Sequence, residues 1–437
     1  MAAVADHTFI PSDTEAVMPT ITIMTGGTRG DVQPYVALGA GLQAAGYTVR
    51  IAASDNFAGL VTDAGLTFVS TGESIEALLN SPPWRATLER GNFVTILRQM
   101  QREMRSRAAQ QARQIPTIIH GSDLLIAGMA GFGGAFTAAL AAQIPILIAH
   151  LFPFTPTRRF PSPLIPVATL GGMLNRLSFR VMQLVFWQTL HAADAATRTT
   201  LGLPAAPLGG PFGQYERQQI PVMYGYSPHV LPRPNDWPPQ HVVTGYWFLD
   251  PPLGWIPPAD LVAFLAAGPP PIYLGFGSMG GRNPEAAGRM ALEALAQTGQ
   301  RGILAAGWGG LTVRDVPPTV HLLEAIPHAW LFPHLAGIVH HGGAGTTAAA
   351  LRAGVPSIVV PFMGDQAFWG KRVAELGVGP PPIARTSLRS VQLGHAIERV
   401  VRDAAMQQRA AVLGQQIDGD RGIPAAVAIV QRLVPVP

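Results

Sequence analysis

Two stretches of the chain share one pattern, a short apolar strand that ends in glycines and is followed by a helix. The first, TITIMTGGTRGDVQPYVALGAGLQAAGYTVRIAAS, runs from Thr20 to Ser54, and the second begins at Pro270 with PPIYLGFGSMGG. A strand, a glycine turn, a helix and a second strand form one βαβ unit. More short apolar strands follow in the second half, among them GILAAGWGG, LAGIVHHGG and VPSIVVPF. This alternation predicts an α/β protein with two Rossmann-like parallel-sheet domains.

The length of the chain and its prolines predict how these domains are divided. With 437 residues, 48% of them hydrophobic, the chain is long enough for two separate cores. The proline-rich segment from Ser227 to Pro258 forbids a long helix and suits a crossing between domains. We predict a flexible tail over residues 1–19, one domain over 20–240, a second over 241–415, and a C-terminal helix over 416–437 that returns to the first domain.

A stretch without charge from Leu124 to Ala149 is long enough to span a membrane. Glycines and Pro145 interrupt it, and it divides into LLIAG, GGAFTAALAAQ and IPILIAH. This pattern favours a buried strand, a small-residue helix and a second buried strand over a transmembrane helix.

The composition argues against several classes of protein. The net charge is only +4, and arginine replaces lysine almost everywhere, with Lys371 the single lysine. No basic block is interleaved with aromatic residues, so no nucleic-acid partner is expected. The chain has no cysteine, which excludes disulfides and thiolate chemistry and fits a cytoplasmic location.

The stretch HHGGAGTTAAALRAG, which begins at His340, follows an apolar strand. Its glycines permit a tight turn and a close approach to the backbone, and Thr346 falls in the first turn of the next helix. Free amides and the positive end of the helix dipole form an anion site, which a phosphate fits. His341 is placed to donate a further hydrogen bond to that anion. The alternative is a capped helix beside two histidines whose hydrogen bonds are satisfied.

Asp365 and Gln366 follow the next strand, in VPFMGDQAFWG. They stand at the carboxyl end of a strand, where α/β sheets bind their ligands. A carboxylate beside an amide offers acceptors and donors to several hydroxyls, as a sugar requires. The alternative is that Asp365 caps the helix over residues 367–376.

The glycine turn GGTRGDVQP of the first half invites a nicotinamide-cofactor interpretation, with Asp55 in the place of a ribose-binding acid. Asp31 opposes it, because a carboxylate at the start of the helix would repel a pyrophosphate. Asp31 is better explained as a helix cap or as a base.

Together these motifs resemble the sterol glucosyltransferases and their bacterial relatives. The resemblance also rests on FPFTPTRRFPSP, YLGFGSM, GWGGL and AIPHAWLFPHLAGIVHHGG, and it extends from about Thr20 to beyond Gly379. These enzymes form part of the UDP-sugar glycosyltransferase family with the GT-B fold, in which two Rossmann-like domains face a central cleft. The resemblance implies that the N-terminal domain binds the acceptor and the C-terminal domain binds the nucleotide sugar.

The resemblance also implies roles for individual residues. Asp31 would be the catalytic base. The nucleotide-sugar site would comprise Gly30, Gly277, Ser278, Trp308, Ile326, His341, Gly343, Ala344, Gly345, Thr346, Asp365 and Gln366. Within that set, His341 and the turn after it would hold the pyrophosphate, Ile326 and Trp308 the uracil, and Asp365 and Gln366 the sugar. Glutamine at 366 implies a preference for glucose.

We therefore expect an inverting, metal-independent transfer of glucose from UDP-glucose to a hydroxyl of an apolar, sterol-like or polycyclic acceptor, with no cofactor. Alternatives are transfer to smaller natural products such as phenols, macrolides or glycopeptides, a nicotinamide-dependent oxidoreductase, and a non-catalytic lipid-binding module. Oxidoreductase chemistry is disfavoured by Asp31, and a lipid module leaves His341 and Asp365 without a purpose.

The acceptor is expected to meet Phe152 and Phe154, in a proline-rich segment that follows a strand. The same segment carries Phe160. Together with the aromatic residues of the next helix, Phe179, Phe186 and Trp187, it would form an apolar pocket, and seven arginines between Arg85 and Arg113 would form a cationic rim. Such a rim predicts reversible contact with an anionic membrane surface.

Overall fold

The computed structural model describes residues 18–72, 74, 77–78, 81–84, 87, 93–165, 167, 169–252, 254–276, 284–305 and 315–436. Some of the sequence predictions fall outside these ranges: the tail to residue 17, Arg85, Arg90, Gly277, Ser278 and Trp308.

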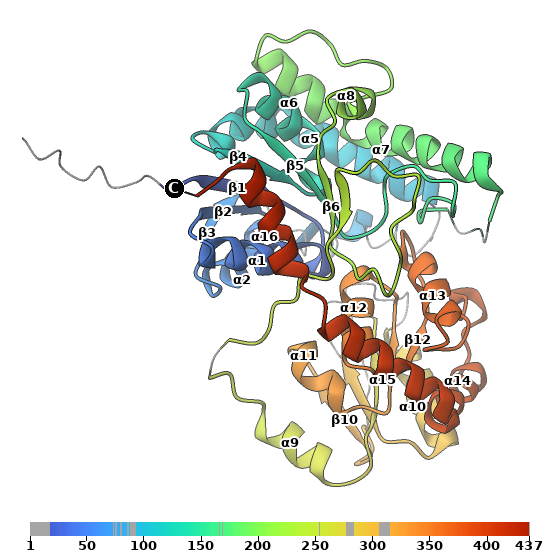
Figure 1. Ribbon diagram of the computed structural model, residues 1–437. Coiled ribbons are helices and arrows are strands. Elements are labelled where there is room, and N and C mark those ends of the chain that lie inside the picture. The colour runs from blue at the N-terminus through green and yellow to red at the C-terminus, as the bar shows by residue number, and fades with distance from the viewer. Residues whose placement is uncertain are drawn as a thin grey trace, which may run out of the picture.

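The described chain forms two sheets in which every strand pair is parallel. The first has the order β3-β2-β1-β4-β5-β6-β7, with β1 Thr20–Met24, β2 Thr48–Ala53, β3 Thr67–Ser70, β4 Leu124–Ala127, β5 Ile146–His150, β6 Val222–Tyr224 and β7 His241–Val243. The second has the order β10-β9-β8-β11-β12, with β8 Ile272–Gly275, β9 Gly302–Ala305, β10 Val320–Leu323, β11 Gly337–His340 and β12 Ser357–Val359. The central strands are buried along nearly their whole length because helices cover both faces of each sheet (Figure 1). The predicted pair of parallel-sheet domains is confirmed.

Helices connect the strands and close both cores. Those of the first domain are α1 Arg29–Ala44, α2 Ala58–Thr62, α5 Phe93–Ile119, α6 Gly134–Ala141, α7 Gly172–Thr200 and α8 Phe212–Arg217, with the 3-10 turns η1 Asp55–Phe57 and η2 Met129–Phe132. Those that follow are α9 Ala259–Ala266, α10 Pro284–Thr298, α11 His328–Leu331, α12 Ala344–Arg352, α13 Gln366–Glu375, α14 Ser390–Arg402, α15 Ala404–Asp418 and α16 Gly422–Leu433, with η3 Phe332–His334 and η4 Arg385–Ser387.

The uncharged stretch from Leu124 to Ala149 forms β4, α6 and β5. The strand-helix-strand interpretation is therefore confirmed, and the length of the stretch was misleading because three buried elements follow one another. Among the helices of the described residues, none combines the length and the apolar character needed to cross a membrane.

The segments between the domains can now be placed. The predicted division after residue 240 falls just before β7, which pairs with β6, so the first sheet extends past it. At the other end, α16 lies against α1, where a Cβ on Gly41 would come within 2.2 Å of Ile423 (Figure 1). Tyr47 Oη donates a 2.6 Å hydrogen bond to the carbonyl of Val434, so the last residues of the chain are tied to the first domain.

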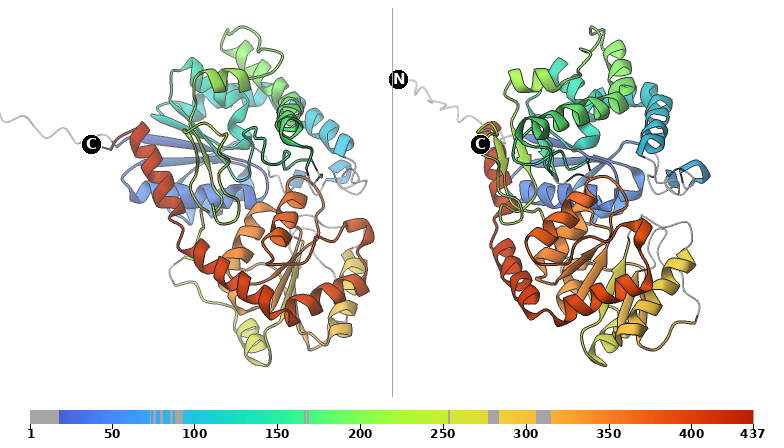
Figure 2. Two further views of the ribbon diagram at one scale, coloured as in Figure 1. Left: turned by 45° about the vertical axis from the view of Figure 1, so that its right-hand side comes forward. Right: turned by 90° about the vertical axis from the view of Figure 1, so that its right-hand side faces the viewer.

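The two domains meet at the carboxyl ends of their strands. The N-terminal ends of α1 and α12 approach so closely that a Cβ on Gly345 would lie 3.2 Å from Cα of Gly30 (Figure 2). Two further contacts cross the interface: the rings of Phe160 and Phe368 lie 5.6 Å apart, and Arg372 Nε donates to the carbonyl of Val230. Ligands of α/β sheets bind at this edge of the strands.

Candidate active site

Asp31 lies in the first turn of α1, after the turn that leaves β1. Its Oδ2 accepts hydrogen bonds from the amide and the hydroxyl of Thr28, at 2.8 and 2.9 Å. Gly27 has a φ of +122°, and a Cβ there would lie 2.5 Å from Oδ2, so glycine is required. The described residues offer no hydrogen bond to Oδ1. Asp31 therefore caps the helix through one oxygen and keeps the other for chemistry.

Burial in the cleft raises the pKa of Asp31 above its usual range, and the two bonds from Thr28 oppose this rise. Because water still reaches the side chain in the free protein, solvent screening also opposes the shift. The direction suits a base, since a carboxyl with a raised pKa holds an abstracted proton better.

Asp365 stands at the N-cap position of α13, but its side chain makes no capping bond. Its Oδ2 instead accepts a 2.7 Å hydrogen bond from the indole of Trp369. The interpretation of Asp365 as a helix cap was therefore wrong, because its carboxylate is hydrogen-bonded to the indole of Trp369, one turn later, and not to a backbone amide of the helix. Trp369 is buried and touches Tyr226 of the first domain, with ring centroids 6.0 Å apart. Sequence reasoning missed Trp369, whose role depends on that packing.

The pKa of Asp365 is raised to about 7, chiefly by burial and further by the charge of Asp31, while the Trp369 bond opposes the rise. The charge of Asp31 in the first domain thus acts on Asp365 in the second. Acids whose pKa values are raised by burial and by a nearby like charge are typical of active sites.

Gln366 is buried, and its side-chain oxygen is already engaged. Oε1 accepts hydrogen bonds from the amides of Phe362 and Met363, at 2.7 and 3.0 Å. Only its amide nitrogen remains to meet a ligand, so the expected use of both ends of the side chain is corrected. The oxygen holds the loop that presents Asp365.

The start of α12 is open. Its N-cap is Gly343, which has no side chain to cap the helix, and the first amide with an intrahelical bond is that of Thr347, 2.9 Å from the Gly343 carbonyl. The amides of Ala344, Gly345 and Thr346 have no intrahelical acceptor, as expected at a helix start. Three free amides and the helix dipole make a site for an anion.

The two histidines before this helix differ. His340 is fully buried, and its Nδ1 accepts from the amide of Gly342 at 3.1 Å. The ring of His341 lies over the turn, where a Cβ on Gly343 would be 2.5 Å from Nε2. Nε2 of His340 and Nδ1 of His341 are buried without a partner in the described chain. The alternative of two satisfied histidines is therefore wrong.

Burial lowers the pKa of His341 to about 4 and that of His340 to about 3. Both rings are neutral at neutral pH, so His341 can donate one hydrogen bond to an anion but adds no charge. The positive charge must come from elsewhere.

Arg29 is the cation that sequence reasoning missed. It opens α1 and its Nε donates to Gln33 Oε1 at 2.9 Å. Its charge lowers the pKa of His328, after burial, the largest cause; His341 acts on His328 in the same direction. The charge of Arg29 in the first domain therefore acts on His328 of the second. The signal was present, because an arginine in a glycine-rich turn beside an anion site is a candidate anion ligand.

His328 opens α11 and stacks on Phe332 at a centroid distance of 4.3 Å. The predicted uracil contact, Ile326, is half-buried between β10 and His328 and packs on the core below. Ile326 is two residues before His328, the histidine whose pKa the charge of Arg29 lowers.

The predicted acceptor residues differ in accessibility. Phe154 is buried against Phe186 and Phe212, whereas Phe152 is half-buried beside it. At the end of β5, His150 is buried next to Phe154, and neither of its ring nitrogens has a partner in the described chain. This histidine was also missed, because only the tertiary structure shows that its ring lacks partners.

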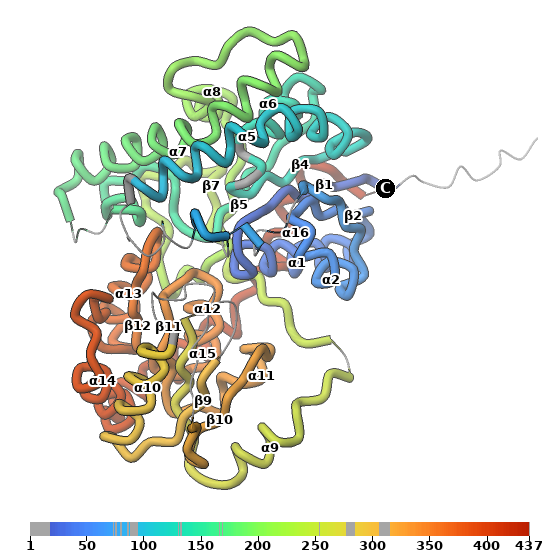
Figure 3. The backbone as a smooth tube through the Cα atoms, turned by 180° about the vertical axis from the view of Figure 1, so that it is seen from behind, coloured from blue at the N-terminus to red at the C-terminus, as the bar shows by residue number. Residues whose placement is uncertain are grey.

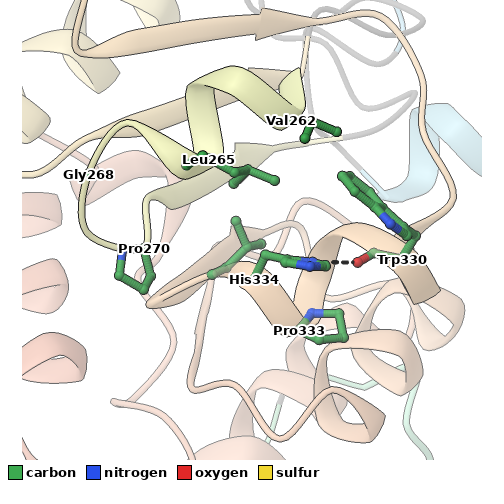
Figure 4. Close-up of a pocket in the computed structure, with 9 residues that line it drawn as sticks. Val262, Leu265, Gly268, Pro270, Trp330, Pro333 and His334 are labelled. Carbon is green, nitrogen blue, oxygen red and sulfur yellow. Dashed lines mark hydrogen bonds between the residues drawn. The ribbon is translucent and has the colours of Figure 1, made fainter. Parts of the chain in front are cut away.

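A shallow groove elsewhere is separate from these residues. It lies between α9 and the α11–η3 segment, where Val262, Leu265 and Trp330 line it and His334 bonds to the Trp330 carbonyl (Figure 4). None of the predicted site residues lines it. Within the described residues, no group of three or more histidine or acidic side chains has the arrangement of a metal site.

Comparison with known proteins places this geometry in a family. Residues 21–161 match the family described as glycosyltransferase family 28 N-terminal domain, and residues 291–435 match the erythromycin biosynthesis protein CIII-like C-terminal domain. A sterol 3-beta-glucosyltransferase of Arabidopsis thaliana is 37% identical over 437 residues, which cover 97% of this chain and 67% of the relative. The chain belongs to the UDP-glycosyltransferase family. This confirms the resemblance and the enzyme class, and it removes the oxidoreductase alternative.

Two further matches show how much sequence and how much fold this glycosyltransferase shares with known proteins. A sterol 3-beta-glucosyltransferase of Cryptococcus neoformans is 35% identical over 94% of this chain, which spans 27% of the fungal protein. The crystal structure of the kitacinnamycin glycotransferase superposes with a TM-score of 0.68 at 19% identity, covering 96% of this chain and all of that one. The GT-B fold is thereby confirmed.

Proposed function

We propose that this glycosyltransferase transfers glucose from UDP-glucose to a hydroxyl of an apolar, sterol-like acceptor, with inversion and without a metal ion. The observation that carries the proposal is that the start of α1, which holds Asp31, touches the open start of α12 at Gly30 and Gly345, with Asp31 close enough for its charge to act on Asp365. The sterol acceptor is supported by the names of the plant and fungal relatives. Cytoplasmic location and contact with a membrane surface belong to the same proposal.

The donor is held by the second domain. The diphosphate accepts hydrogen bonds from the amides of Ala344, Gly345 and Thr346 and from His341. Arg29 supplies the full positive charge that the neutral histidines lack. The glucose hydroxyls meet the carboxylate of Asp365 and the amide nitrogen of Gln366, which is supported by their position at the end of β12.

The reaction is a single displacement. The acceptor oxygen attacks the anomeric carbon from the face opposite the diphosphate, and the bond from that carbon to the diphosphate oxygen breaks. Oδ1 of Asp31, which Thr28 leaves free, takes the hydroxyl proton. Negative charge develops on the leaving UDP, where the helix amides and Arg29 stabilise it, so no metal is required. One displacement inverts the configuration at the anomeric carbon.

The test is direct. The protein is incubated with UDP-glucose or UDP-galactose and with separate sterol, small-phenol and macrolide acceptors, with and without EDTA. Mass spectrometry should show hexose added to sterols, faster with UDP-glucose and unaffected by EDTA, and NMR should show a β-linked product. Faster transfer to phenols or macrolides would favour the natural-product alternative, which the CIII-like match also supports. Loss of activity in EDTA, restored by Mg²⁺, would overturn metal independence.

A further inference from the structure

Helix α7 presents a row of apolar side chains to solvent. The exposed fractions are 80% for Met173, 55% for Leu174, 54% for Leu177 and 47% each for Val181 and Leu184. At 3.6 residues per turn, these five positions fall within about 100° around the helix axis and share one face. We call them the α7 stripe. Single exposed apolar residues are ordinary on a protein, but an aligned row marks an interaction surface.

The stripe is not the apolar surface that the sequence predicted. Phe179 and Trp187, which were expected to line an apolar pocket at this surface, are each 1% exposed and pack into the first domain. That expectation was wrong because aromatic content does not reveal which face of a helix is covered. The face that remains open carries aliphatic side chains.

Positive charge surrounds the stripe. From Leu151 to Ala193 the sequence contains four arginines and no acidic residue. Arg180 pairs with Glu216 at 2.6 Å, whereas Arg158, Arg159 and Arg176 are exposed and form no ion pair within the described part of the chain. Asp236 lies near these arginines. It accepts a hydrogen bond from the backbone amide of Arg158, and the charge of Arg176 helps to lower its pKa. The rim of the stripe is thus cationic.

A second cationic row lies on the neighbouring helix. α5 packs along α7 (Figure 3) and exposes Arg98, Arg102, Arg105 and Arg113 on one face. The acid on this helix, Glu103, is bonded to Arg107 at 2.7 Å and so does not neutralise the row. The two packed helices therefore combine exposed aliphatic groups with exposed arginines.

We propose that the α7 stripe and its arginine rim dock reversibly on an anionic lipid bilayer. A bilayer offers apolar chains to the leucines and anionic headgroups to the arginines. A second copy of this chain fits worse, because a two-fold contact between stripes would bring the arginine rims together.

The stripe begins beside the active site. The loop before α7 carries Phe160, whose ring meets Phe368, three residues beyond Asp365. The N-terminal end of α7 extends above α13 in Figures 1 and 3. A docked protein would hold its cleft near the lipid surface, where an apolar acceptor resides. The delivery of an acceptor from the lipid rests on the proposed function, whereas the docking of the α7 stripe on lipid does not.

Vesicle cosedimentation tests the docking. The wild-type protein should bind phosphatidylcholine vesicles that contain phosphatidylglycerol at low salt, bind pure phosphatidylcholine weakly, and be released at high salt. The triple variant Leu174→Gln/Leu177→Gln/Leu184→Gln should bind at least about tenfold less. A matched control, Leu208→Gln/Ile256→Gln/Val391→Gln, removes three exposed apolar residues elsewhere and should bind as the wild type does.

A second variant and a second measurement make the result decisive. Arg158→Gln/Arg159→Gln/Arg176→Gln should depend less on phosphatidylglycerol and salt than the wild type does, since only the arginines of α5 remain. Equal vesicle binding by the wild type and the leucine variant would overturn the proposal. So would a dimer in sedimentation velocity that the leucine variant converts to monomer while neither binds vesicles. UDP binding by the leucine variant should be unchanged, so a failure of docking is distinguishable from a failure of the glycosyltransferase function.

Discussion

The starts of α1 and α12 are alike in backbone and opposite in chemistry. Each follows a parallel strand and a glycine turn, and the two ends touch at Gly30 and Gly345. At α1, the carboxylate of Asp31 occupies the first turn and bonds to Thr28. At α12, the N-cap is Gly343, which leaves the amides free. A helix start binds an anion only if no side-chain carboxylate already occupies it.

The difference explains how one cleft holds both a base and a leaving group. The acid at α1 has a raised pKa, which favours proton uptake, and the histidines at α12 have lowered pKa values, which keep them neutral donors. Arg29, at the start of α1, places a positive charge that acts across the interface on His328. Four substitutions test this comparison.

The largest effect should come from Asp31→Asn. Asparagine keeps an acceptor for the amide of Thr28 but cannot take a proton, so turnover should fall by at least about 100-fold, roughly 2.7 kcal/mol of transition-state stabilisation. UDP affinity by calorimetry should be nearly unchanged. The control Asp55→Asn alters an exposed acid that bonds to Ser70 Oγ and should keep turnover. Normal turnover in Asp31→Asn would reduce Asp31 to a helix cap.

His341→Ala removes a donor from the anion side only. UDP affinity should fall by about 1.5–3 kcal/mol, the range for a hydrogen bond to a charged group. His334→Ala, at the surface groove, serves as the control in the same calorimetric titration. An unchanged affinity would remove His341 from the diphosphate site.

Arg29→Gln separates charge from hydrogen bonding. UDP affinity should fall by about 3–10-fold at low salt and by less at high salt, since the lost term is a screened charge interaction. Arg402→Gln removes an exposed arginine of α14 and should change nothing. If UDP binding keeps its affinity and its salt dependence, Arg29 does not face the diphosphate.

The smallest effect concerns stability and pH. Asp365 has a folded-state pKa of about 7, above its unfolded value, so its contribution to stability is present at acidic pH and is lost as the pH rises through 7. Asp365→Asn should therefore match the wild-type Tm near pH 4 and exceed it by about 1–3 °C at pH 8.

Asp31→Asn provides the internal check on that profile. Removing the like charge should lower the folded-state pKa of Asp365, so the fall in Tm with rising pH should be smaller and should end at a lower pH. Thermal scans across pH 4–8 measure both variants. A Tm difference for Asp365→Asn that is constant with pH would contradict the raised pKa.

The sequence by itself determined the fold class and the local form of the site. Apolar runs bounded by glycines specify buried parallel strands, and their spacing specifies βαβ units. Glycines at 342 and 343 followed by a helix predict an open anion site, because the responsible atoms are backbone amides a few residues apart. Asp31 could likewise be assigned two roles from its place in a single turn.

The tertiary structure alone decided which distant side chains meet. Trp369 touches Tyr226 because α13 packs against the first domain, and the charge of Arg29 acts on His328 because the ends of α1 and α12 abut, with about 300 residues of chain between Arg29 and His328. The same holds for the α7 stripe, since periodicity marks two apolar faces on that helix but not which of them the domain covers. Contacts between residues far apart in sequence depend on how whole elements pack, and no local pattern records that.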